Sequence, residues 1–282
     1  MESQNYVLHD KSNEFYWEGD GQLSIKTFRY GRALYKTNRG FFAVEEGRYL
    51  LLNEGAYTIA IEEETEVESF CLFFRKGLAE EVLRTLKADS DNLLADPFKP
   101  LNSVDFFEKT YPFSSVLSTQ IDYFRGNTTT KSDPLWKEEQ FQQLMETIVR
   151  EQFHAVMETE ALPSLKMGTR EELYRRISTA HEYIRAFYQQ PVTLQQISQA
   201  ASLSTNHLLR NYSAIYGCTP HQHVTALRIE KAKQLLMKTE KTITDIALNL
   251  GFETPASFSK MFKQHAGISP LQFRKKVILD KK

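Results

Sequence analysis

Residues Ile243 to Arg274 read ITDIALNLGFETPASFSKMFKQHAGISPLQFR, and this stretch decides the fold of the C-terminal part of the chain. It predicts two short helices around a tight turn, with Phe258, Met261 and Phe262 forming an apolar stripe on the second helix. Two short helices joined in this way are typical of a helix-turn-helix, whose first helix supports the second and whose second helix enters the DNA major groove.

The same pattern occurs again about fifty residues upstream. Positions of the first helix and the turn recur at an offset of 49 residues: Thr193/Thr242, Leu194/Ile243, Ile197/Ile246 and Leu203/Phe252. Positions of the second helix and the segment after it recur at an offset of 50 residues: Leu208/Phe258, Tyr212/Phe262, Gly217/Gly267 and Pro220/Pro270. Two copies that differ by one inserted residue are hard to reach by chance, so the sequence predicts a tandem helix-turn-helix.

The region from Tyr174 to Lys276 resembles the DNA-binding domain of the AraC/XylS family of bacterial transcription regulators. Beside the duplication, the resemblance rests on short motifs of the second unit: Ile246-Ala247, Gly251-Phe252, Phe258, Phe262-Lys263, Gly267-Ile268-Ser269-Pro270 and Phe273-Arg274. It covers about a third of the chain. The resemblance implies a C-terminal DNA-binding domain and an N-terminal cupin-like domain for effector binding or dimerisation.

The distribution of charge separates the two halves of the chain. The 282 residues carry a net charge of −1, and this length fits two domains better than one. Residues 1–169 hold 18 Lys and Arg against 28 Asp and Glu, whereas residues 170–282 hold 17 against 8. An acidic first half and a basic second half indicate separate tasks, with the phosphate-facing surface confined to the second half.

The first half shows the short periodicity of β-strands. Leu23, Ile25 and Thr27 alternate with polar neighbours, and so do Tyr57, Ile59 and Ile61. Turn signals, including one at Glu63 to Thr65, separate these segments from short apolar runs at residues 41–44, 49–52 and 67–74. We therefore expect an antiparallel sandwich or small barrel over residues 5–75, in an α+β chain whose C-terminal domain holds about seven helices.

Helical spacing replaces the strand pattern after residue 75. Apolar residues predict a helix at Leu78, Val82 and Leu86, another at Leu117, Ile121 and Phe124, and a long amphipathic helix over residues 135–159. The stripe of the long helix is expected to pack on its own domain; the alternative is pairing across a two-fold axis in a homodimer. The expected boundaries are an effector or dimerisation domain at 1–160, a linker at 161–172 and the DNA-binding domain at 173–282.

The alternative function is a cupin-type metal enzyme with a DNA-binding appendage. His9 is the only histidine before His154, so three imidazoles cannot converge on a metal in the first half. We therefore expect no enzyme activity, no metal and no cofactor, while an apolar pocket for a small effector stays open. Cys71 and Cys218 are expected to be spectator thiols of a reducing cytoplasm, since nothing directs the chain to export or to a membrane.

Aligning the chain with the reading helices of the family implies a set of DNA contacts. The implied base-reading residues are Asn206, Leu209 and Arg210 in the first copy and Pro255, Ala256, Ser259 and Lys260 in the second. The implied phosphate contacts are Ser204, Thr254, Lys263, Arg274, Lys275 and Lys276. Arginine can donate two parallel hydrogen bonds to guanine and asparagine can pair with adenine, whereas a lysine at position 260 lacks the planar fork of arginine.

The sequence thus predicts a transcription regulator that binds double-stranded DNA. Its two reading helices should enter successive major grooves about 34 Å apart, or some 10 base pairs. Further candidate partners are a small-molecule effector, RNA polymerase and a second copy of the chain. The effector, the target genes and the direction of control do not follow from the residues.

Overall fold

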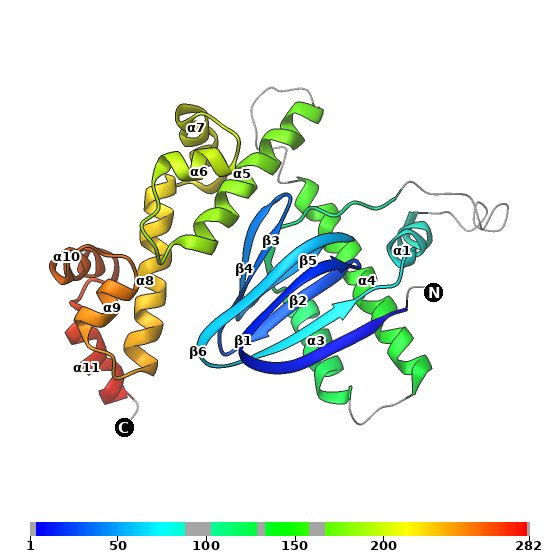
Figure 1. Ribbon diagram of the computed structural model, residues 1–282, viewed down its shortest axis with the longest axis horizontal. Coiled ribbons are helices and arrows are strands. Elements are labelled where there is room, and N and C mark those ends of the chain that lie inside the picture. The colour runs from blue at the N-terminus through cyan, green and yellow to red at the C-terminus, as the bar shows by residue number, and fades with distance from the viewer. Residues whose placement is uncertain (1–3, 88–102, 129–132, 158–166, 281–282) are drawn as a thin grey trace. The chain divides into compact units, whose positions relative to one another are not determined.

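The computed structural model describes residues 4–87, 103–128, 133–157 and 167–280 (Figure 1). The chain forms two compact units, one up to Pro163 and the other from Ser164. The first unit is a nearly closed antiparallel barrel with helices, and the second is helical throughout its described residues, so the predicted α+β fold is confirmed. None of the described helices is long and apolar enough to cross a lipid bilayer.

The sheet of the N-terminal unit is antiparallel in every strand pair and follows the order β4-β3-β6-β2-β5-β7, with β1 paired to β6. Its strands are β1 (Tyr6–Gly21), β2 (Ser24–Arg29), β3 (Arg32–Thr37), β4 (Gly40–Glu45), β5 (Arg48–Leu52), β6 (Gly55–Phe73) and β7 (Thr110–Pro112). The strand β6 pairs with β3 through its first half and with β2 through its second half, so it runs through both parts of the barrel.

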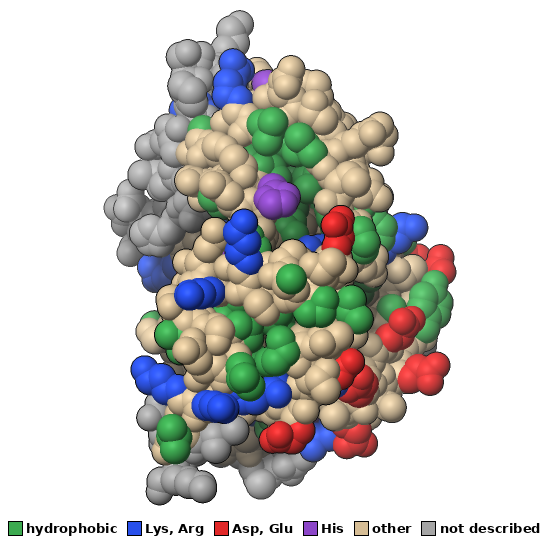
Figure 2. All heavy atoms as spheres, turned by 90° about the vertical axis from the view of Figure 1, so that its left-hand side faces the viewer, with side chains coloured by type: hydrophobic (Ala, Val, Ile, Leu, Met, Phe, Trp, Pro, Cys, Tyr) green, Lys and Arg blue, Asp and Glu red, His purple; other side chains and the backbone are tan. Residues whose placement is uncertain are grey.

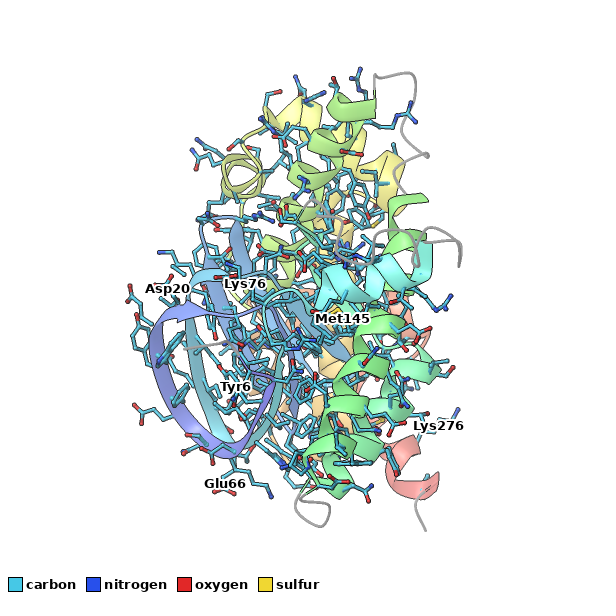
Figure 3. All side chains as sticks on the ribbon, turned by 90° about the vertical axis from the view of Figure 1, so that its right-hand side faces the viewer. Tyr6, Asp20, Glu66, Lys76, Met145 and Lys276 are labelled. Carbon is cyan, nitrogen blue, oxygen red and sulfur yellow. The ribbon has the colours of Figure 1, made fainter. Side chains whose placement is uncertain are left out.

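A bend in β6 replaces the turn that we expected at Glu63 to Thr65, and that expectation was wrong. The partner of β6 changes register there: Ser12 lies opposite Val67, whereas Glu14 lies opposite Glu62. The extra residues of β6 form a bulge, which bends both strands without interrupting them. Figure 3 shows β1 curving between Tyr6 and Asp20, with Glu66 at the bend.

Three helices complete the described part of the N-terminal unit: α1 (Leu78–Lys87), α3 (Ser115–Asn127) and α4 (Pro134–Met157). The apolar stripe of α4 is buried in one core with the sheet, through Phe141, Leu144, Met145, Ile148 and Val149. The stripe therefore packs on its own unit and is not free to pair with a second copy. The last two residues of the helix expected over 135–159 lie outside the described residues.

The C-terminal unit has seven helices in its described residues: α5 (Met167–Phe187), α6 (Leu194–Ala200), α7 (Thr205–Tyr216), α8 (Pro220–Lys238), α9 (Ile243–Asn249), α10 (Pro255–Ala266) and α11 (Pro270–Asp280). The start of α5 corrects the expected linker, because residues 167–172 are helical. Charged residues stabilise the first part of this helix on its exposed side, as the ion pair between Glu172 and Arg176 shows at 2.8 Å. Residues 161–166 lie outside the described part of the chain.

Candidate nucleic-acid interface

The first helix-turn-helix consists of α6 and α7. Thr193 and Gln196 form a capping box at the start of α6, and the Ser204 hydroxyl caps α7 by accepting a hydrogen bond from the amide of His207. The turn between the helices passes through Ser202, whose φ of 51° is left-handed. The next amide, that of Leu203, donates to the carbonyl of Ser198 at 2.9 Å, which closes the end of α6.

The second helix-turn-helix repeats this construction with α9 and α10. The starts of these helices, Ile243 and Pro255, reproduce the offsets of 49 and 50 residues from the starts of α6 and α7. The left-handed position of the turn is now Gly251, with φ of 72°, and the next amide, that of Phe252, donates to the carbonyl of Ala247 at 3.0 Å. The duplication in the sequence is therefore a duplication of the backbone, including the turn.

An arginine from the helix preceding each unit holds each turn. The Arg176 Nη1 atom on α5 donates to the carbonyl of Ser202 at 3.0 Å, and the Arg228 Nη1 atom on α8 donates to the carbonyl of Gly251 at 2.9 Å. Arg228 also donates to the carbonyls of Tyr188 and Gln190 after α5, at 2.7 and 2.8 Å. The sequence analysis did not identify either arginine. The helices of the two units recur at offsets of 49 and 50 residues, whereas Arg176 and Arg228 do not follow either offset.

The two units differ in the chemistry of their cores. In the first unit the hydroxyl of Tyr212 lies 2.8 Å from Nδ1 of His223 and 3.2 Å from Nδ1 of His181. In the second unit the equivalent positions of Tyr212 and His223 are Phe262 and Phe273, whose rings meet edge to face at 5.5 Å. The ring of His223 is half-buried in the core of the first unit.

The residues implied to read bases lie on the reading helices with different exposure. Asn206, Arg210, Ala256 and Lys260 are exposed, whereas Leu209, Pro255 and Ser259 are half-buried. Arg210 and Lys260 occupy equivalent positions, and neither makes a hydrogen bond or ion pair with any described residue. Two long cationic side chains are thus free for a ligand on the two reading helices.

The residues implied to contact phosphate separate into three groups. Ser204 and Thr254 use their hydroxyls as helix caps, which leaves them next to the amides at the starts of α7 and α10. Lys263, Lys275 and Lys276 are exposed, and Figure 2 shows lysine and arginine side chains among apolar ones on the side where α10 lies. Arg274 differs, because it is half-buried and its Nη2 atom donates to the carbonyl of Lys241 at 2.6 Å. This bond gives Arg274 a structural role in the free protein.

Comparison with known proteins agrees with this geometry. A helix-turn-helix domain family matches residues 197–276. An uncharacterised helix-turn-helix transcriptional regulator of Bacillus subtilis, YisR, is 30% identical over 262 residues, which cover 86% of this chain and 82% of the relative. The chain belongs to the AraC/XylS family of transcription regulators. Similar proteins named for a function include the lactose operon transcription activator of Staphylococcus xylosus, 32% identical over 98 residues, or 35% of each chain.

Among solved structures, an AraC-type regulator from Chromobacterium violaceum is 27% identical and covers 40% of this chain and 96% of its own, with a TM-score of 0.34. As an AraC/XylS protein, the chain is a DNA-binding transcription regulator. In the described residues no three His, Cys, Asp or Glu side chains lie together in a way that could hold a metal ion.

Proposed function

We propose that α7 and α10 read two groups of bases in successive major grooves of one operator. The observation that carries this proposal is the pair of equivalent, exposed and unpaired cations Arg210 and Lys260, one on each reading helix. They face solvent in a unit whose sequence carries 17 Lys and Arg against 8 Asp and Glu from residue 170 onward. A surface of this kind favours a polyanion with a regular repeat.

The two helices should contribute unequally to specificity. Arg210 can donate two hydrogen bonds to one guanine and the exposed Asn206 can pair with adenine, so the first helix has direct readout chemistry. At Lys260 a single flexible ammonium replaces the fork, and Pro255 and Ala256 offer apolar contact alone. The first half of the operator should therefore be the more strictly defined half.

Phosphate contacts would fix the register of the protein on DNA. We assign this role to the exposed Lys263, Lys275 and Lys276 and to the starts of α7 and α10 beside Ser204 and Thr254, where unpaired amides favour an anion. Arg274 should contribute least to phosphate binding, since its Nη2 atom already donates to the carbonyl of Lys241. Binding should weaken steeply with salt, because each phosphate contact releases counterions.

Selection of binding sites by the full chain from randomised duplex DNA tests the proposal. We expect two enriched blocks of bases with centres about 10 base pairs apart, one block sharper than the other. Arg210→Ala should erase preference within the sharper block. Lys233→Ala is the control, because Lys233 is paired with Glu230 on α8 at 2.6 Å and has no proposed contact.

Two outcomes would contradict this reading of the groove contacts. Enrichment of a single block would mean that α10 does not read bases. Unchanged base preference in Arg210→Ala, with weaker binding to all sequences, would make Arg210 a phosphate contact.

The N-terminal unit is proposed to control this activity through a small effector or through homodimerisation. The burial of the α4 stripe leaves the homodimer without the interface that the sequence suggested, so its test is the mass of the full chain in solution. Contact with RNA polymerase, action in the cytoplasm and the lack of enzyme activity and cofactor are parts of the same proposal, because they follow from the role of a transcription regulator.

A further inference from the structure

A cavity of about 280 Å³ lies inside the bend of β1 and β6. Its wall is mainly apolar and includes the aromatic residues Tyr6, Phe15, Trp17, Tyr35, Tyr57 and Phe73. A mostly apolar cavity with a small number of polar groups is the usual form of a small-molecule site in proteins.

The bulge explains how both halves of β1 face this cavity. Before the bulge the lining residues of β1 are even-numbered, as at Leu8 and Ser12, whereas the next two lining residues after it, Phe15 and Trp17, are odd-numbered. A regular strand would turn one of these halves outward, since side chains alternate between the two faces. The register shift thus lets a single strand line two sides of the cavity.

Lys26 of β2 is the cationic residue of the lining, and it is 1% exposed. Its Nζ atom donates to the Tyr57 hydroxyl at 3.0 Å and lies 3.6 Å from the centre of the Phe73 ring. In the part of the chain that the structure describes, no carboxylate lies within ion-pair distance of this ammonium.

The ammonium of Lys26 is therefore a positive charge whose immediate contacts, the Tyr57 hydroxyl and the Phe73 ring, are neutral. Burial lowers the pKa of Lys26 to about 8, so the amine is still mostly protonated at pH 7. Burial raises the pKa of Tyr35, Tyr57 and Cys71, which keeps these neighbours uncharged. A buried cation with one neutral hydrogen-bond partner lacks the anion that normally accompanies it.

We propose that this cavity binds a small organic acid, whose carboxylate pairs with Lys26 and Tyr57 and whose apolar body packs on the aromatic wall. The proposal rests on the effector control proposed for the N-terminal unit, and names the chemistry of the effector. Since a water molecule takes about 30 Å³ of liquid, the cavity has room for a ligand of roughly ten non-hydrogen atoms.

Two carboxylates refine the expected ligand. Asp10 and Asp20 also line the cavity and are exposed, so they lie toward its opening. A second negative charge at the far end of a ligand would meet them. The site should therefore prefer monoacids to diacids of the same length.

Calorimetric titration of the full chain with phenylacetate and octanoate tests this assignment. We expect both acids to bind at least tenfold more tightly than phenylacetamide and octanamide, and octanoate more tightly than octanedioate. The affinity for the acids should fall as the pH rises above about 8, because the amine loses the charge that attracts the carboxylate.

Lys26→Met should abolish the preference for acid over amide, and it should still fold because it removes a buried charge. Tyr57→Phe is a second, isosteric variant that should weaken the acids severalfold. The control is Lys36→Met, which removes an exposed lysine of the neighbouring strand β3 and should leave the affinities unchanged.

Equal binding of acid and amide, unchanged acid binding in folded Lys26→Met, or no binding of either acid would overturn the proposal. Operator binding is measured separately, so its failure would leave the acid site standing. If the acids bind as expected but do not change operator affinity, the site stands and its regulatory role is overturned.

Discussion

The two helix-turn-helix units have the same backbone conformation but differ in the side chains of their cores. Both have a capped support helix, a left-handed turn residue and a reading helix that ends at a left-handed glycine, Gly217 in one and Gly267 in the other. The first unit has a hydrogen-bonded Tyr212 and His223 where the second has Phe262 and Phe273. The hydrogen bonds of the backbone therefore fix this motif, while its core tolerates either polar or apolar aromatic side chains.

The arginines that hold the turns should show the largest difference between the units. Arg228→Ala removes donors from three carbonyls and should lower the free energy of unfolding by about 3 kcal/mol. Arg176→Ala removes one exposed bond to a turn carbonyl and the exposed ion pair with Glu172, and should cost about 1 kcal/mol. Urea unfolding of the full chain, followed by circular dichroism, measures both. Equal losses would show that the second turn depends no more on its arginine than the first.

Substitution of the two equivalent cations, Arg210 and Lys260, should affect DNA binding in different ways: the first should lower specificity and the second should lower affinity for all sequences. Arg210→Ala should cost about 2 kcal/mol on a selected operator and little on scrambled DNA, because it removes contacts to one base. Lys260→Ala should cost about 1 kcal/mol on both DNAs. Fluorescence anisotropy at fixed salt concentration gives the four affinities. A loss of specificity in Lys260→Ala that matches Arg210→Ala would remove the proposed asymmetry between the two reading helices.

Exchanging one core residue tests whether the two cores are adapted to their own chemistry. Phe262→Tyr places a hydroxyl where its neighbours are phenylalanines and should destabilise the protein by about 1 to 2 kcal/mol. Tyr212→Phe takes a hydroxyl away from two histidines and should cost about 1 kcal/mol. Thermal unfolding of the two variants gives the order. A neutral Phe262→Tyr would mean that the second core has room and partners for a polar group.

Substitution of the turn residue Ser202 should give the smallest change in the free energy of unfolding, and this change should be stabilising. Ser202 adopts a left-handed conformation that costs a residue with a side chain about 1 kcal/mol, and glycine relieves this cost while making the unfolded chain more flexible. Ser202→Gly should therefore be stabilising by about 0.5 kcal/mol. A midpoint shift in urea is the measurement, and a destabilised variant would show that the Ser202 side chain contributes to the first turn.

The helices of the C-terminal unit could be predicted from the sequence because the signals that determine them lie within or next to each helix. Apolar spacing, capping residues such as Thr193 and the repeat offset fixed its helices to within a few residues. The start of α5 was missed, since Pro163 and Gly168 are typical of a linker, whereas the ion pair between Glu172 and Arg176 forms only on a helix face. The arginines at the turns were missed because their partners are backbone carbonyls, and every residue type carries a backbone carbonyl.

The fold class of the N-terminal unit could be predicted from the sequence, but the register of its strands could not. The alternation around Ile25 and Ile59 indicated an antiparallel barrel. It did not show that one strand continues through the bend at residues 63–66, because the same residues are typical of a turn. The cavity could not be found for the same reason: the face of β1 that points inward changes at the bulge, and Lys26 enters the site only once β2 is paired with β6.

The long strand β6 has a consequence for the order in which the protein acquires its structure. Its pairing with β1 joins Tyr6 to Phe73, so the barrel closes only after residues distant along the chain have met. The repeated units form most of their contacts between neighbouring helices, and local contacts are made faster than distant ones. The part of the polypeptide that leaves the ribosome first is therefore the part that we expect to fold more slowly.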